Sequence, residues 1–211
     1  KRGRLDNGNT AFDTCKYSRD EIRRLAKKGF DLAMKRSKKL CCVDKANVLE
    51  SSRLWRETVQ GMEKEYPEVE VSYEFVDAVA MRLVQWPKAY DVLITENLFG
   101  DILTDEASVI SGSMGLMPSA SVGNENALYE PIHGSFPQAT GLGIANPLAA
   151  ILSAAMMLEM SFGLTEEGAF IRKVVEQSLK VGIVTEDLKE SGEKGNSTAE
   201  VGDYLVSMIL G

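Results

Sequence analysis

The stretch Leu40-Cys41-Cys42-Val43-Asp44-Lys45 is a short apolar run that ends abruptly in two charged residues. Such a run, bounded by polar residues, is typical of a strand that is buried on both faces of a sheet. Residues 49–66 follow with apolar side chains at a helical spacing, which ends at Pro67. A buried strand followed by a helix is the unit of α/β proteins, so this stretch predicts a sheet flanked by helices.

The same alternation continues on both sides of this stretch. Ser18 and Glu21 have the spacing of a capping box, which predicts the start of a helix that extends to Met34. Downstream we expect a strand at 69–75, a helix at 76–84, a strand at 90–95 and a helix at 99–110. The predicted fold class is therefore α/β, with layers of parallel or mixed sheet flanked by helices.

The second half of the chain has a different character. Residues 111–147 hold most of the glycine and proline residues of this half and show no strong periodicity, which predicts a long functional loop. Three helices are expected after it, from about Pro147, at 166–181 and at 198–209. We place the boundary between two domains after residue 111, which gives domains at 1–111 and 112–211.

Composition excludes several classes of protein. Hydrophobic residues make up 44% of the 211 residues, enough for a core, so disorder is excluded as the main state. The formal net charge of -7 argues against nucleic-acid binding, because an acidic surface repels phosphate. The single histidine, His133, excludes zinc sites built from several histidines. Three cysteines form no disulfide framework and indicate a reducing compartment such as the cytoplasm, and no apolar run is long enough to span a membrane.

Two carboxylates follow the strand expected at 90–95. Asp101 and Asp105 lie four residues apart in a predicted helix, so they share one face at a separation of roughly 6 Å. Oxygen ligands at that spacing suit Mg²⁺ or Mn²⁺, and ligands of α/β proteins bind where strands end. A solvated helix face with acids near its N-terminus explains the same spacing, and spacing alone favours this simpler interpretation.

Asp77 and Lys45 are isolated charges at the ends of other predicted strands. Asp77 is flanked by apolar residues where a strand meets a helix, and Lys45 ends the first apolar run. Each could be a helix cap or a side chain that reaches solvent. Together with the two carboxylates they predict a metal site with an adjacent lysine.

Several motifs match one enzyme family. The segment Val43-Asp44-Lys45-Ala46-Asn47-Val48-Leu49-Glu50 resembles the lysine motif of the 3-isopropylmalate dehydrogenases, and residues 97–105 resemble the metal motif. Residues 112–121, 130–135 and 143–147 continue the match, so the resemblance covers essentially the whole chain. The wider isocitrate/isopropylmalate dehydrogenase family consists of metal-dependent dehydrogenases that decarboxylate 2-hydroxyacids.

The resemblance implies a role for each matched charge. Asp77, Asp101 and Asp105 would hold Mg²⁺ or Mn²⁺, which chelates the substrate. Lys45 would remove the proton of the C2 hydroxyl before hydride leaves for the nicotinamide, and the metal would stabilise the enolate formed by decarboxylation. In this family Lys45 and Asp77 serve the active site of the partner subunit, so a homodimer with shared active sites is expected.

The resemblance also implies substrate and cofactor contacts. Asn47 and Val48, beside Lys45, would border the nicotinamide and the isopropyl group of 3-isopropylmalate. The expected contacts to NAD are Glu130, His133, Gly134, Ser135, Gln138 and Asn146. At position 138 many NAD-using members carry an acidic residue; glutamine still binds a ribose hydroxyl but does not repel a 2′-phosphate. Because no lysine replaces that acid, NAD remains the expected cofactor.

The implied activity is oxidative decarboxylation of 3-isopropylmalate to 2-oxoisocaproate in leucine biosynthesis. The family's upstream portion, with its substrate arginines and tyrosine, is absent, so the chain is expected to be a C-terminal fragment. Residues 1–111 would form the substrate, metal and dimerisation domain, and residues 112–211 half of the cofactor domain. The alternatives are a D-malate or tartrate dehydrogenase, or a non-catalytic homologous subunit.

Overall fold

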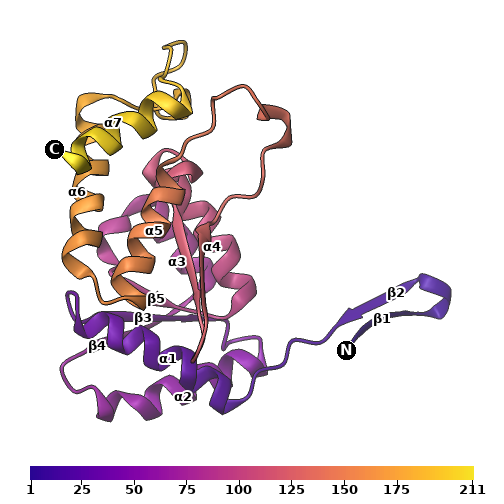
Figure 1. The fold of residues 1–211 in the computed structure, drawn as a ribbon. Coiled ribbons are helices and arrows are strands. Elements are labelled where there is room, and N and C mark those ends of the chain that lie inside the picture. The colour runs from indigo at the N-terminus through magenta and orange to yellow at the C-terminus, as the bar shows by residue number, and fades with distance from the viewer. The chain divides into compact units, whose positions relative to one another are not determined.

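A computed structural model describes residues 1–211. The chain forms two compact units, Lys1–Glu106 and Ala107–Gly211, and the division falls within helix α4, Asn97–Ser111. Figure 1 shows the helices and strands of both units.

The first unit contains a three-stranded parallel sheet in the order β4-β3-β5. Its strands are β3 (Lys39–Asp44), β4 (Glu70–Phe75) and β5 (Val92–Ile94). Leu40 is aligned with Val71 on one side and with Val92 on the other, so β3 is the central strand. The apolar run from which the α/β prediction started therefore lies in the middle of the sheet, and the predicted fold class is confirmed.

Helices cover both faces of this sheet. Their bounds are α1 Arg19–Met34, α2 Glu50–Met62, α3 Val76–Gln85 and α4 Asn97–Ser111. Leu40 and Cys42 are buried in one cluster with α1 and α2, whereas Cys41 and Val43 are buried in another with α3 and α4. Successive residues of β3 thus alternate between two cores, as the period of a strand requires.

The sequence-predicted elements of this unit are found close to their expected bounds. The capping box at the start of α1 is present, with the side chain of Ser18 accepting from the backbone N–H of Glu21. Before Ser18, where the sequence predicts no element, β1 (Arg2–Leu5) and β2 (Thr10–Asp13) pair as an antiparallel hairpin. Both strands are almost wholly exposed, so no hydrophobic alternation marks them in the sequence.

The second unit is helical, with one antiparallel hairpin. Helices α5 (Leu148–Ser161), α6 (Thr165–Val181) and α7 (Thr198–Leu210) share a core that includes Leu148, Val174 and Leu205. Strands β6 (Pro118–Val122) and β7 (Ala127–Pro131) lie within the segment that we expected to be loop. That expectation is wrong for these residues. Two serines on β6, and the paired Pro118 and Pro131 at the open end of the hairpin, weaken the apolar alternation of the two strands.

No helix of the chain has the combination of length and apolar character that crossing a membrane would require.

Candidate functional site

Lys45 lies directly after β3, at the carboxyl end of the central strand. Its Nζ is 2.7 Å from Oδ1 of Asp77, which stands in the first turn of α3. The side chain of Lys45 is 25% exposed and that of Asp77 64% exposed, so this ion pair is open to solvent. The hydrogen bond from Lys45 lowers the pKa of Asp77 below its usual value, which keeps the carboxylate ionised.

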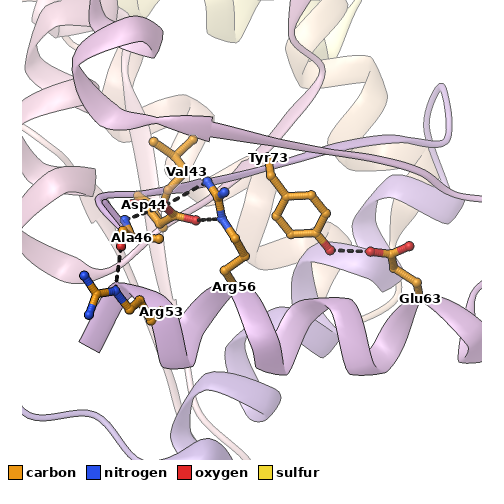
Figure 2. Close-up of polar contacts among 8 residues, drawn as sticks. Val43, Asp44, Ala46, Arg53, Arg56, Glu63 and Tyr73 are labelled. Carbon is orange, nitrogen blue, oxygen red and sulfur yellow. Dashed lines mark hydrogen bonds and ion pairs between the residues drawn. The ribbon is translucent and has the colours of Figure 1, made fainter. Parts of the chain in front are cut away.

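The turn that carries Lys45 is held by groups on both sides of it. The buried carboxylate of Asp44 accepts the backbone N–H of Ala46 at 2.8 Å, and Arg53 donates to the carbonyl of Ala46 at 2.9 Å. Arg56 donates to both oxygens of Asp44, at 2.8 and 3.1 Å, from the helix α2 that Figure 2 shows beneath the strand. Because both backbone polar groups of Ala46 are engaged, the peptides on either side of it are held and the direction in which Lys45 leaves the strand is fixed.

The start of helix α4, which carries the two carboxylates that the sequence singled out, is held by Glu96. The buried side chain of Glu96 accepts the backbone N–H groups of Leu98 and Phe99, at 3.0 and 3.1 Å, and so satisfies the start of this helix. The hydroxyl of Tyr17 donates to the same carboxylate at 2.8 Å. Burial and this hydrogen bond raise the pKa of Tyr17.

Asp101 and Asp105 are both exposed on α4, one helical turn apart, as predicted. Two carboxylates at that spacing are a fitting donor set for Mg²⁺ or Mn²⁺, which prefer hard oxygen ligands. Asp77 does not join them within the chain: no group of three or more histidine, cysteine, aspartate or glutamate side chains could hold a metal. One chain therefore offers at most two of the three predicted ligands at one place.

A cavity of about 790 Å³ lies in the second unit. Four of the six predicted cofactor contacts line it: His133, Gly134, Ser135 and Asn146. Its volume lies within the roughly 300–1,000 Å³ that is usual for sites of small molecules and cofactors. The hydrogen-bonding groups that line the cavity and its volume both fit one part of a dinucleotide.

The other predicted contacts lie elsewhere. Glu130 is exposed on β7 and Gln138 is exposed in the short turn Pro137–Ala139, and neither lines the cavity. Asn47 and Val48 are exposed in the turn that follows Lys45.

Sequence reasoning missed two groups of residues at these sites. One is the pair of Asp44 and Arg56, and the other comprises Glu186 and Asp187, which line the cavity. Thr185 separates these two acids from the apolar pair Ile183-Val184, so the signal that pointed to Lys45, a charge at the end of an apolar run, was present there only in a weaker form. The adjacent cysteines of β3 are both buried, and burial raises the pKa of Cys41 to about 11.

The chain was compared with known protein families, and the family described as isocitrate/isopropylmalate dehydrogenase matches residues 1–205. Among curated proteins, a 3-isopropylmalate dehydrogenase from Desulfitobacterium hafniense is 52% identical over 209 residues, covering 99% of this chain. One from Pseudomonas savastanoi pv. phaseolicola is 55% identical over 207 residues, covering 97% of this chain. The chain spans 59% and 58% of the length of these two relatives.

Solved structures of dehydrogenases superimpose closely on the chain. An isocitrate dehydrogenase from Methylococcus capsulatus superimposes with a TM-score of 0.90 at 36% identity, covering 96% of this chain and 60% of that one. A β-decarboxylating dehydrogenase from Thermococcus kodakarensis gives a TM-score of 0.85 at 36% identity, covering 98% and 60% of the two chains.

Proposed function

The chain belongs to the isocitrate/isopropylmalate dehydrogenase family, and from this premise we propose that it is part of a 3-isopropylmalate dehydrogenase. The proposed reaction is oxidative decarboxylation of 3-isopropylmalate to 2-oxoisocaproate with reduction of NAD. The observation that carries the proposal is the Lys45–Asp77 ion pair at the carboxyl end of the central strand. It lies in a chain more than half identical to relatives that bear this name.

The residues of the chain have separate tasks in this proposal. Lys45, in its neutral amine form, takes the proton of the substrate's C2 hydroxyl, directly or through water, from a turn that Asp44 and Arg53 hold in place. Asp101 and Asp105 supply carboxylate oxygens to Mg²⁺ or Mn²⁺, and Asp77 supplies a third. A bound metal would polarise the C2 oxygen, and a bound nicotinamide would accept hydride. Asn47 and Val48 border the substrate.

The cavity of the second unit is the proposed site of the cofactor. His133, Gly134, Ser135 and Asn146 line it. Its charged lining residues are Glu186 and Asp187, and it has no lysine or arginine. An acidic lining repels a 2′-phosphate, which supports NAD over NADP even though Gln138 carries no charge. Glu130 and Gln138, which lie outside the cavity, remain proposed contacts to parts of the cofactor beyond it.

A homodimer completes the proposed active site. Because Asp77 is not grouped with Asp101 and Asp105 in one chain, we infer that Lys45 and Asp77 serve the metal site of the partner subunit. We further propose that residues 1–111 form the substrate, metal and dimerisation domain and that residues 112–211 contribute to the cofactor domain. The proposed setting is leucine biosynthesis in the cytoplasm.

A chimera tests the activity. The chain replaces the matching segment of the Pseudomonas savastanoi relative, which supplies the remaining length. Formation of NADH is then measured with 3-isopropylmalate, isocitrate and D-malate in the presence of Mg²⁺. We expect the highest kcat/KM with 3-isopropylmalate, and a higher value with either other acid would contradict the proposed substrate.

Two variants of the chimera separate chemistry from folding. Lys45→Ala is expected to lower kcat by about 10²–10⁴, the usual contribution of a general base, with the circular dichroism spectrum unchanged. Lys39→Ala, at the opposite end of the same strand, is the control and is expected to retain activity. Turnover by Lys45→Ala at the rate of the chimera would exclude Lys45 as the base.

A further inference from the structure

Asp187 joins three segments that are far apart in the sequence. It lies in the short turn Glu186–Leu188, between α6 and α7. Its carboxylate accepts hydrogen bonds from the hydroxyl of Ser113, from Nδ2 of Asn146 at 3.0 Å and from the hydroxyl of Thr185 at 2.5 Å. No pattern in the sequence predicts that these three donors would bind one carboxylate.

The donors are themselves held in fixed orientations. Oδ1 of Asn146 accepts the backbone N–H of Leu148 at 2.9 Å, so the amide is bound at both of its ends. The hydroxyl of Ser113 accepts the backbone N–H of Gly115, also at 2.9 Å. A Cβ on Gly115 would lie 2.6 Å from Cβ of Asn146, so only glycine allows this turn to approach the asparagine so closely.

This cluster lies at the proposed cofactor site. Gly115, Asn146 and Asp187 all line the cavity, together with His133. A carboxylate can accept about four hydrogen bonds, and that of Asp187 already accepts three. Partial desolvation opposes ionisation of Asp187, whose side chain is still exposed in part, but the hydrogen bonds from Ser113, Thr185 and Asn146 outweigh it, so its pKa is lowered and it is ionised at neutral pH.

We propose that Asp187 is the positioning residue of this cavity, which fixes the amide of Asn146 and the turn at Ser113–Gly115 so that a dinucleotide meets a preformed surface. The proposal rests on the assignment of the cavity to NAD. Its physical basis is preorganisation: side chains already held in the bound geometry need not be ordered when the ligand binds. Asp187 acts through Asn146 and Ser113, with little capacity left for contacts of its own.

Calorimetric titration of the chimera with NAD is the first test. Asp187→Asn keeps the shape of the side chain but brings an amide donor against donors, and we expect its affinity for NAD to fall by about tenfold or more. Glu190→Gln removes the same charge from the same loop and is the matched control, with an expected change of less than about twofold. Equal affinities of Asp187→Asn and the wild type would overturn the proposal.

A double-mutant cycle separates positioning from general stability. Because Asp187 is proposed to act through Asn146, the losses of Asp187→Asn and Asn146→Ala should not add in the double variant. The side-chain amide resonance of Asn146 should also move in Asp187→Asn. Additive losses, or an unmoved resonance, would overturn the proposal. A chimera that carries none of these substitutions and binds no NAD would overturn the assigned cavity as well, and that failure is distinct because it precedes any substitution.

Discussion

At the scale of single residues, the carboxylates of α4 are the first to test. Asp101→Asn in the chimera removes one charged oxygen ligand from a cation that requires nearly octahedral oxygen coordination. We expect the Mg²⁺ concentration for half-maximal activity to rise by at least about tenfold, since losing even an outer partner of a metal ligand costs about 10–100-fold. Asp20→Asn, at an exposed acid in the first turn of α1, is the control. An unchanged Mg²⁺ requirement would restore the interpretation of a solvated helix face.

The lowered pKa of Asp91 should make the free energy of unfolding depend on pH. Hydrogen bonds from Ser37 and Arg36 lower the pKa of Asp91 from 3.8 to about 2. A group whose pKa is lowered by folding stabilises the protein above its unfolded pKa, and this contribution disappears as the pH falls through the folded value. We therefore expect the free energy of unfolding to fall between about pH 4 and 2 more steeply in the wild type than in Asp91→Asn. Urea unfolding at several pH values measures both slopes, and identical slopes would contradict the prediction.

At the scale of elements, two glycines in helices of the first unit predict opposite effects. A Cβ on Gly29 of α1 would lie 2.3 Å from Cγ2 of Ile94 in β5, and this methyl belongs to a buried, branched side chain. Gly29→Ala should therefore lower the free energy of unfolding by about 1–3 kcal/mol, the usual cost of overpacking. Gly61 of α2 has no atom within 4 Å of its Cβ position, so Gly61→Ala should raise stability by up to about 1 kcal/mol. Changes of the same sign in urea unfolding would contradict this account.

Elements were predicted well where burial imposes a period and poorly where it does not. The strand at Lys39–Asp44 and the helix at Arg19–Met34 each follow the pattern expected of a face packed against a core. The hairpins at 2–13 and 118–131 are paired by backbone hydrogen bonds between half-exposed or exposed strands. Such pairing needs no particular side chains, so it leaves a weak signal in the sequence.

At the scale of the whole molecule, exposed apolar side chains indicate where a second copy would bind. Met81 and Val84 on α3 are 61% and 66% exposed, and Leu98 and Ile102 on α4 are 61% and 57% exposed. Helix α2 has no large hydrophobic side chain among its exposed residues. We therefore predict that a dimer forms chiefly through α3 and α4, since burial of apolar surface drives association.

Light scattering of the chain after size-exclusion chromatography tests this dimer. The wild type is expected to have the mass of two chains and Val84→Glu that of one, because the substitution would bury an unpaired charge. Leu32→Glu, at an exposed position of α1, adds the same charge and should leave the dimer intact. A monomeric wild type would contradict both the interface and the proposed shared active site.

The sequence by itself determined the α/β class, the order of helices and strands around β3, and the charged residues that stand where strands end. These properties are local: periodic burial, helix caps and the abrupt end of an apolar run are all visible within a few neighbouring residues. Only the tertiary structure revealed that Asp44 and Arg56 fix the turn of Lys45, and that Asp187 gathers Ser113 and Asn146 at one cavity. Ser113 and Asp187 are 74 residues apart in the sequence. A contact over that distance depends on how the whole chain packs, so a local pattern of apolar residues contains no information about it.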